Sequence, residues 1–409
     1  MTNTRKPTTF VILKKKIHII GGGAASLSFA CHIDTHKYDV FLHEKNKTLG
    51  RKFLVAGEGG LNITHSEPIQ TMIKRYHPSN FIEPFLKHFS NQDLIQWLNQ
   101  LGIQTYVGSS GRVFPNKNIK PIQVLNILIN KMKVNGVNVF TEHQLMDWNN
   151  DELIFDNKGL TIYKPYDIAV FSLGGSSWKI TGSDGAWLEQ FMNKGIKTVQ
   201  FKSSNSSCYT YWDKNFIGKN QGKYIKNIEV KCKENSIKGE IVLTKNGIEG
   251  ACIYALNRQI REELELNNFA TILIDLKPNW DIQKMEELMV KNQNLNITEF
   301  LKTKLNLNKT AIELLKIHLN KEEFIHHHSL FKAVKNLKIK IQSLAPIDEA
   351  ISTVGGIELS ELNSDLELKK HPTIHCIGEM LNWDAPTGGY LLQACFSMGK
   401  FLADKINQQ

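Results

Sequence analysis

The chain has 409 residues, of which 41% are hydrophobic and 22% charged, and its formal net charge is +10. This length and composition exclude a small module with a single core and predict two or three globular domains. The basic balance does not by itself establish a nucleic-acid partner, because lysines are spread through the whole chain and a solvated basic surface explains them.

Membrane, secretory and thiol-based functions find no support in the sequence. No run of about eighteen apolar residues occurs, and the stretch from Phe10 to Leu13 is too short for a signal-peptide core. We therefore expect a cytoplasmic protein without a membrane partner. The six cysteines are scattered without a C-x-x-C pair, so we expect buried thiols rather than metal ligands or a redox disulfide.

The first predicted elements form one βαβ unit. Lys16 to Ile20 is a β-rich apolar run, and Ala24 to about His36 has helical character. Tyr38 to His43 is a second β-rich run, which ends at Glu44. This order places the first crossover of a parallel sheet at the N-terminus.

Further helices and strands up to about Gly185 complete an α/β domain. One helix is predicted from Asn91, as its N-cap, to Gly102, and another from Pro121 to Gly136. The predicted strands are Val137 to Phe140, Glu152 to Phe155 and Tyr166 to Ser172.

The pattern changes between about Gly195 and Leu344. Ile241 to Thr244 and Ile248 to Tyr254 are predicted to form a hairpin, because the Asn246-Gly247 turn tolerates positive φ. Several short amphipathic helices are expected over 282–319. A strand over 373–377 and a helix from the turn at 386–390 to about Ile406 then return the chain to the first domain.

These patterns predict an α/β fold with a discontinuous domain and an insertion. The first domain spans 14–190 and 345–409. The inserted substrate region spans 191–344, and we expect it to be β-rich over 196–275 and helical over 280–336.

A dinucleotide-binding turn follows the first strand. Gly21-Gly22-Gly23-Ala24-Ala25-Ser26 matches the first two glycines of G-x-G-x-x-G and has Ser26 at the third. Gly21 permits the tight turn, Gly23 lets the backbone approach a pyrophosphate, and the helix start offers N–H donors. Glu44 lies where a carboxylate binds adenosine ribose hydroxyls, which favours FAD or NAD over NADP.

A glycine-dense loop over residues 50–65, GRKFLVAGEGGLNITH, follows the second strand. Such a loop can bring backbone N–H groups, together with Arg51 or Lys52, against a ligand. A flexible surface loop is the alternative, but it would not need so many apolar residues between its glycines.

This loop resembles the GRK-x-x-x-(S/T)-G-G-G-R-C-N-x-T-N segment of a family of bacterial flavoproteins, the HI0933-like proteins. The family also contains enzymes called aminoacetone oxidase and a bile-acid ene-reductase. Gly60 and Leu61 replace its Arg-Cys pair and His65 its last Asn, which resembles a subgroup with a GGLN-x-TH loop. The likeness extends to Gly111-Arg112-Val113-Phe114-Pro115, to LGGSSW at 173–178 followed by TGSDG at 181–185, and to most of the C-terminus.

The most specific match is GEMLNWDAPTGGYLLQ at 378–393, which resembles G-E-x-L-D-x-x-x-P-T-G-G-Y-x-L-Q with Asn382 for Asp. Glu379 can bond ribityl hydroxyls, and the helix start at Thr387-Gly388-Gly389-Tyr390 can direct N–H groups at the pyrimidine edge of a flavin. The resemblance implies a Rossmann-like FAD-binding domain of the glutathione-reductase type with an inserted region that is part β-barrel-like and part helical.

FAD is therefore the predicted cofactor. The predicted cofactor-binding residues are Gly21, Gly23, Ala24, Ala25, Ser26, Glu44, Lys45, Arg51, Lys52, Gly57, Gly59, Gly60, Asn62, Thr64, Gly174, Gly175, Gly378, Glu379, Thr387, Gly388, Gly389 and Tyr390. Asn62, His65 and Tyr390 are the candidates for a catalytic role. No metal site is predicted, because the His326-His327-His328 triplet lacks acidic partners at ligand spacing.

Three functions fit these features. The first is an FAD-dependent oxidoreductase that exchanges a hydride between flavin N5 and a small organic substrate, with NAD(P)H or oxygen as the other redox partner. The second is an FAD-dependent enzyme that modifies nucleic acid such as tRNA, which lysines clustered on one face of the inserted region would favour. The third is a non-catalytic flavin-binding protein.

Overall fold

The computed structural model describes residues 13–55 and 60–409. Its packing divides the chain into two compact units, which we call unit 1 and unit 2. Unit 1 comprises Met1–Gly175, Ile180–Gln200 and Gly355–Gln409, and unit 2 comprises Ser176–Lys179 and Phe201–Val354. Within the described residues, no helix is both long and apolar enough to cross a membrane.

Unit 1 is built on a six-stranded sheet in the order β20-β21-β10-β1-β2-β6. Neighbours from β21 to β6 run parallel, whereas β20 is antiparallel to β21. The last four residues of β1 (Lys15–Ile20) are buried, as expected of a parallel strand covered on both faces. The other strands are β2 (Tyr38–Glu44), β6 (Asn138–Thr141), β10 (Ile168–Phe171), β20 (Glu367–Leu368) and β21 (His371–Cys376).

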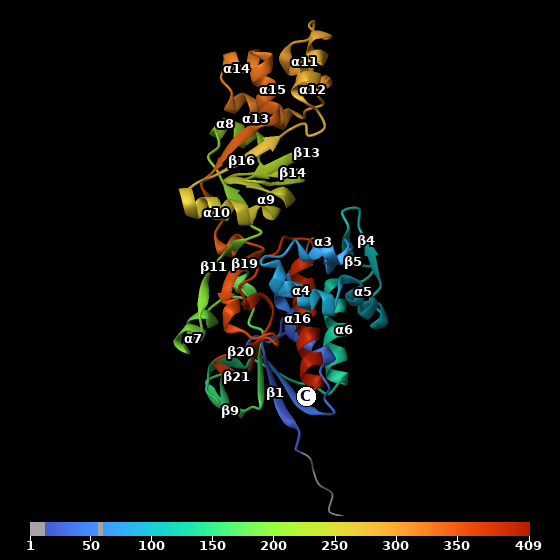
Figure 1. The fold of residues 1–409 in the computed structure, drawn as a ribbon, viewed down its shortest axis with the longest axis vertical. Helices are drawn as coiled ribbons and strands as arrows, with labels where there is room; N and C mark the ends of the chain where they lie inside the picture. Colours follow the sequence, from blue (N-terminus) through green and yellow to red (C-terminus); the bar gives the residue numbers. More distant parts are fainter. Residues whose placement is uncertain (1–12, 56–59) are drawn as a thin grey trace, which may run out of the picture. The chain divides into compact units, whose positions relative to one another are not determined.

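The first and last helices of unit 1 pack against each other. The Oγ of Ser28, in α1 (Ala24–His32), donates to the carbonyl of Phe396, in α16 (Tyr390–Asn407), over 2.7 Å. A Cβ on Gly399 would lie 2.5 Å from the carbonyl oxygen of Ala25, so only glycine permits this approach. Helix α4 (Ser79–His88) lies beside α16 (Figure 1).

A three-stranded antiparallel sheet of β7 (Gln144–Trp148), β8 (Glu152–Asn157) and β9 (Leu160–Pro165) contributes to a buried aromatic layer. Phe155 of β8 stacks on His43 of β2, with 4.3 Å between ring centroids. His43 Nε2 lies 2.9 Å from His18 Nδ1, and His43 Nδ1 lies 3.1 Å from His143 Nδ1. The three imidazoles therefore form a buried hydrogen-bonded chain, which we call the histidine chain.

The surroundings of the histidine chain favour neutral rings. Burial, with a smaller contribution from Lys164, lowers the pKa of His18 to about 4. Burial and the neighbouring His18 lower the pKa of His43 to about 2, and burial also lowers the pKa of His143. All three rings are therefore uncharged at neutral pH.

The remaining elements of unit 1 are short. They are α2 (Arg51–Val55), β3 (Thr64–His65), α3 (Ile69–Ile73), α5 (Asn91–Gln100), β4 (Thr105–Val107), β5 (Arg112–Pro115), α6 (Pro121–Val134), η1 (Lys179–Thr181), α7 (Trp187–Asn193), η3 (Leu359–Glu361) and η4 (Gly378–Met380). Strands β3, β5 and β4 pair in that order. Strands β11 (Thr198–Ser204) and β19 (Ser352–Ile357) pair with each other and carry the chain from one unit to the other.

Unit 2 contains a seven-stranded sheet in the order β17-β16-β13-β14-β15-β12-β18. Only Gln342 separates β17 (Leu337–Ile341), at one end of this order, from β18 (Ser343–Leu344), at the other. One nearly continuous strand therefore joins both edges and closes the sheet into a barrel. The other strands are β12 (Cys208–Tyr209), β13 (Tyr224–Cys232), β14 (Asn235–Thr244), β15 (Gly247–Glu249) and β16 (Ala270–Asp275).

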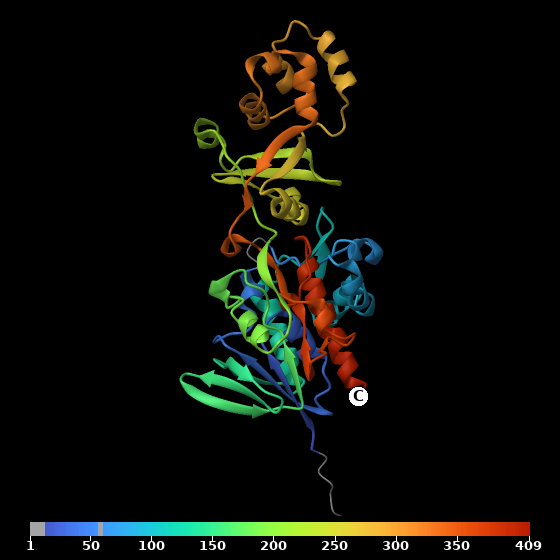
Figure 2. The same cartoon turned by 60° about the vertical axis from the view of Figure 1, so that its left-hand side comes forward.

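Alternating residues of these strands form the core of unit 2. In β17 the residues Leu337, Ile339 and Ile341 are buried, whereas Lys338 and Lys340 are exposed. Helices α9 and α10 lie outside the barrel on one side, and α8 and α13 lie outside it on the opposite side (Figures 1 and 2). The helices of unit 2 are α8 (Lys214–Asn220), α9 (Ala251–Ala255), α10 (Asn257–Asn267), α11 (Ile282–Val290), α12 (Ile297–Thr303), α13 (Lys309–His318), α14 (Lys321–Ile325), α15 (His327–Lys335) and η2 (Ile347–Glu349).

The structure confirms the predicted βαβ unit but corrects two helix boundaries. Helix α1 ends at His32 rather than near His36, and its cap Ile33 already has an extended backbone. The N-cap of α5 is Ser90 rather than Asn91, because the Ser90 side chain accepts from the Asp93 N–H and Asp93 returns a hydrogen bond in a capping box.

The predicted hairpin forms, but for a different reason. Thr244 pairs with Gly247 across a two-residue turn, and neither Asn246 nor Gly247 has positive φ. A Cβ on Gly247 would lie 1.9 Å from the carbonyl oxygen of Cys208, so the glycine admits the neighbouring strand β12. The second strand is also shorter than predicted, because α9 begins at Ala251.

Candidate functional site

The turn between β1 and α1 leaves open space over the start of the helix. Gly21 has φ of +103° and donates its N–H to the carbonyl of His43 over 2.8 Å. Gly23 is the N-cap of α1, with no side-chain cap, and a Cβ placed there would meet no atom within 4 Å. The N–H groups of Ala24 and Ala25 begin the helix, while the buried Ser26 Oγ has no hydrogen-bond partner among the residues that the structure describes. This opening suits a pyrophosphate, which the helix start attracts.

Glu44 is fixed at the end of β2, beside the same turn. Its Oε2 accepts from the N–H of Gly22 over 2.8 Å, and its Oε1 accepts from the N–H and the side-chain amide of Asn46. Each carboxylate oxygen can accept more than one hydrogen bond, so Glu44 retains capacity for ribose hydroxyls.

The basic side chains that were predicted to contact the cofactor bind other groups of the protein. Lys45 Nζ lies 2.7 Å from the carboxylate of Asp184, and Lys52 Nζ lies 2.7 Å from that of Glu379. Arg51 donates to the side chain of Asn46 over 3.3 Å and to a main-chain carbonyl in η1 over 2.9 Å. The Lys52–Glu379 pair joins two of the predicted cofactor segments.

The glycine-dense loop contributes a second unsatisfied polar atom. Gly57 and Gly59 lie outside the described residues, whereas Gly60 has φ of +101°. The Oδ1 of Asn62 is buried without a hydrogen-bond partner in the described part of the chain. A buried polar atom of this kind is costly unless a ligand or water completes it.

The carbonyl groups of Gly174 and Gly175 are engaged by nearby side chains. Trp187 Nε1 donates to the carbonyl of Gly174, and Ser183 Oγ donates to that of Gly175, each over 3.0 Å. These bonds hold the turn after β10 in place. This turn sets the positions of the Gly174 and Gly175 N–H groups.

The segment 378–390 returns to the N-terminal loops. A Cβ on Gly378 would lie 3.0 Å from the Cβ of Ala25, so the start of this segment touches α1. Gly389 has φ of +90° and caps α16, and a Cβ there would lie 2.5 Å from the Cα of Thr64. Thr387 and Gly388 stand immediately before this cap. The segment thus touches α1 at its beginning and the loop ending at β3 at its end, where α16 starts.

A hydrogen-bonded cluster supports the start of α16. The hydroxyl of Tyr390 donates to Glu67 over 2.7 Å, and Arg75 binds the same carboxylate through Nε and Nη2 over 3.2 and 3.0 Å. Although burial opposes it, the bonds from Arg75 and Tyr390 lower the pKa of Glu67. Burial and Glu67 raise the pKa of Tyr390, so the phenol stays protonated.

His65 has both ring nitrogens engaged. Its Nδ1 accepts from the Glu67 N–H over 3.1 Å, which leaves Nε2 to donate to the carbonyl of Ser110 over 3.0 Å. The ring also stacks on Tyr390, with 5.4 Å between centroids. Of the three catalytic candidates, only Asn62 therefore has an unused polar atom among those that the structure reports as buried.

Sequence reasoning assigned no role to Glu67, Arg75 or Arg112. The first two belong to no glycine motif, and their partner Tyr390 lies more than 300 positions further along the chain. Arg112 stands inside the matched Gly111–Pro115 segment, so a signal for it was present. The histidine triplet serves local structure: His326 caps α15 and His328 pairs with Glu286 over 2.7 Å.

The fold is that of the FAD-binding Rossmann-like flavoproteins. A flavocytochrome c3 fumarate reductase aligns with 97% of this chain and 78% of its own at a TM-score of 0.51 and 13% identity. The 3-ketosteroid-delta4-(5alpha)-dehydrogenase of Rhodococcus jostii RHA1 aligns with 99% of both chains at a TM-score of 0.51 and 12% identity.

The HI0933-like protein Rossmann domain model matches residues 15–405, and this chain belongs to that family. A 3-dehydro-bile acid delta(4,6)-reductase of Clostridium scindens is 23% identical to it, covering 94% of this chain and 97% of the relative. A ribosomal RNA dihydrouridine synthase of Escherichia coli is 22% identical, covering 93% and 94%. Another enzyme of that name, from Haemophilus influenzae, is 23% identical, covering 96% and 98%.

Proposed function

We propose that this chain is an FAD-dependent oxidoreductase that exchanges a hydride between flavin N5 and a small organic substrate, with NAD(P)H or oxygen as the other redox partner. The observations that carry the proposal are that the segment 378–390 touches α1 at Ala25 and β3 at Thr64, and that the start of α1 is open at Gly23. The buried Ser26 Oγ and Asn62 Oδ1 also lack a hydrogen-bond partner among the described residues. The fold of FAD-binding flavoproteins and the chain's membership of the HI0933-like family support FAD as the ligand.

The residues present fit FAD. Gly23 and the start of α1 would accept the pyrophosphate, Glu44 the adenosine ribose, and Asn62 with the start of α16 the flavin. Bound FAD would supply the hydride chemistry at N5, while the protein binds, orients and excludes water. The other predicted residues of the β1–α1 turn, the loop at 50–65 and the segment 378–390 would line the same site. Gly60, Thr64 and Glu379 are among them.

We further propose that the substrate carries a carbon–carbon double bond conjugated to a carbonyl group. The names of two relatives, a delta(4,6)-reductase of 3-dehydro-bile acids and a dihydrouridine synthase, both denote saturation of such a bond. A reductase of this class needs little acid–base machinery beyond one proton donor, because positioning against flavin N5 supplies most of the catalysis. This agrees with a site whose His65 and Tyr390 are already hydrogen-bonded.

The test begins with the visible spectrum of the purified protein and its anaerobic titration with NADH and NADPH. We expect flavin absorbance that bleaches with one nicotinamide and recovers when an α,β-unsaturated ketone is added without oxygen. Recovery only in air would identify an oxidase, and a flavin that no donor or substrate reduces would leave the non-catalytic role. A protein that binds no FAD on reconstitution would refute the proposal.

A second candidate function, modification of RNA, has one structural observation in its favour. On the exposed side of the barrel in unit 2, Lys338 lies across from Leu273, and Leu273 lies across from Lys231. Lys340 stands over the ring of Phe269 at 4.3 Å from its centroid. Lysines on adjacent strands, with an aromatic ring just before one of these strands, are a suitable surface for a phosphate backbone and a base.

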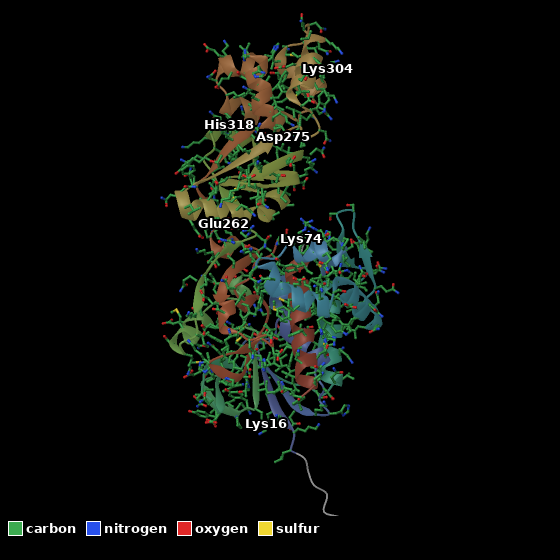
Figure 3. All side chains as sticks on the ribbon, viewed as in Figure 1. Lys16, Lys74, Glu262, Asp275, Lys304 and His318 are labelled. Carbon is green, nitrogen blue, oxygen red and sulfur yellow. The ribbon has the colours of Figure 1, made fainter. Side chains whose placement is uncertain are left out.

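Lysines elsewhere weaken this candidate. Lys16, Lys74 and Lys304 are exposed on separate parts of the chain, as Figure 3 shows, so the positive charge does not gather on the barrel. RNA retention that falls steeply with salt and is lost in a Lys231→Gln, Lys338→Gln, Lys340→Gln variant would favour RNA as the substrate. RNA retention that is unchanged in this variant would show that these three lysines do not bind RNA.

A further inference from the structure

Arg112 differs from every other described arginine. Arg75 and Arg258 form ion pairs with Glu67 and Glu262, and Arg51 and Arg261 donate to main-chain carbonyls. Within residues 13–55 and 60–409, the guanidinium of Arg112 forms neither a hydrogen bond nor an ion pair, although the residue is half-buried. A partly desolvated cation without a partner is unfavourable, which indicates that a group outside the described residues completes it.

The backbone of Arg112 is held within β5, so the fold sets the point from which its side chain extends. In β5, Arg112 lies opposite His65 of β3, and its carbonyl accepts the N–H of Gly108 over 2.8 Å. His65 contacts the carbonyl of Ser110 through Nε2 and the N–H of Glu67 through Nδ1, so both of its ring nitrogens are already engaged. The carboxylate of Glu67 is already bound by Arg75 and Tyr390.

Arg112 is directed toward the start of α16. A Cβ on Gly388 would lie 3.8 Å from Arg112 Nε, and Gly388 itself is buried with φ of +125°. Gly389 then caps α16, which is 18 residues long and directs a partial positive charge out of its N-terminus. A cation beside a positive helix end is unfavourable unless negative charge lies between them.

The flavin is the group whose charge suits this place. On reduction it gains negative charge at its N1/C2=O edge, the edge that the start of α16 faces in the proposed site. Thr64 and Gly389 lie in direct contact beside Arg112, so a pyrimidine edge at the helix start would lie within reach of the guanidinium. This step rests on the proposed function.

We propose that Arg112 is the cation that stabilises the negative charge of reduced flavin at N1/C2=O and thereby raises the reduction potential of the bound FAD. The guanidinium acts together with the helix start, and preorganised charges of this kind are effective because they need no rearrangement during the reaction. Arg112 is thus a residue that sets the driving force of hydride transfer.

The test uses the FAD-loaded full-length protein and three variants. Arg112→Gln removes the charge, Arg112→Lys keeps it at a shifted position, and Lys338→Gln removes one charge from the barrel as a matched control. The two-electron midpoint potential and the affinity for sulfite, which adds to N5 and leaves negative charge at N1, are measured without substrate. Thermal unfolding of the apo proteins checks the fold.

We expect Arg112→Gln to weaken sulfite binding at least tenfold and to lower the potential by about 30 mV, the two-electron equivalent of a tenfold shift. Arg112→Lys should recover part of both, and Lys338→Gln should match the parent. A potential that Arg112→Gln leaves unchanged would overturn the inference, as would a rise confined to the KM of the substrate. Failure of the parent to bind FAD would instead overturn the proposed function.

Discussion

The two units achieve order by different means. In unit 1, close backbone approaches at Gly21, Gly389 and Gly399 and polar side chains such as Glu67 hold loops around an opening. Unit 2 is held by one continuous apolar core, which includes Phe300 and Phe331. We therefore expect substitutions around the opening in unit 1 to affect ligand binding first, and substitutions in the core of unit 2 to affect stability.

The largest expected effect tests the stability half of this comparison. Phe331 is fully buried in the core of unit 2, and Phe331→Ala should lower the free energy of unfolding by about 3–5 kcal/mol. FAD affinity of the folded protein should stay at the parental value. Urea unfolding followed by circular dichroism, with FAD titration of the native variant, measures both, and a parallel loss of FAD affinity would contradict the division of roles.

Gly23→Val tests the functional half. Its side chain would enter open space and the backbone φ of −86° accepts it, so the stability of the apo protein should not change. The same side chain would displace the pyrophosphate, and FAD should bind about 10–100-fold more weakly, since each lost hydrogen bond to a charged group costs about 1.5–3 kcal/mol.

Gly218→Ala is the matched control for this variant, because a Cβ there also meets no atom within 4 Å. Isothermal titration with FAD compares the two. If both variants bound FAD like the parent, the dinucleotide would not lie at the start of α1.

The histidine chain lies in unit 1, so it should make the stability of unit 1 depend on pH. The pKa of His18 is lowered from 6.5 to about 4, so the unfolded state takes up a proton before the folded state does. The contribution of His18 to the free energy of unfolding is therefore fully present above about pH 6.5 and is lost as the pH falls toward 4. The free energy of unfolding then decreases by about 1.4 kcal/mol per pH unit for each such histidine.

Replacing His18 with Phe should reduce the slope of unfolding free energy against pH by about 1.4 kcal/mol per pH unit, the contribution of one histidine. Urea unfolding at pH values from 7 to 4.5 gives the slope, and His36→Phe, on the surface of the same unit, is the control. An unchanged slope in His18→Phe would show that the buried rings do not control acid stability.

The smallest effect is expected on the outer face of the barrel. Lys338→Gln should change the unfolding free energy by less than about 0.5 kcal/mol, since its side chain is exposed. Thermal unfolding measures this, and a larger loss would mean that the outer face contributes to the stability of the barrel.

Local signals in the sequence were sufficient for the βαβ unit and for the loops at 21–26 and 378–390, because glycine requirements and strand periodicity act over a few residues. They could not reveal contacts between distant positions. Strands β7 and β9 were missed because they are short and half exposed, and the closure of the barrel at Gln342 depends on a bend rather than on a motif.

The same limit applies to the site. Glu44 was predicted at the end of β2, and it lies there beside the turn at Gly22. Arg112 and the cluster around Glu67 depend on three segments that only the fold brings together. The reason for Gly247 also lay outside its own turn, in the carbonyl of Cys208 on another strand.

The packing of α16 on α1 has a consequence for synthesis of the chain. The ribosome produces α1 and β10 long before β21 and α16, which complete the sheet and cover the helix. Until then β10, whose four residues are all buried in the finished unit, is an unpaired apolar edge that can associate with other chains. Unit 1 can therefore complete its sheet only after β21 and α16 have been synthesised.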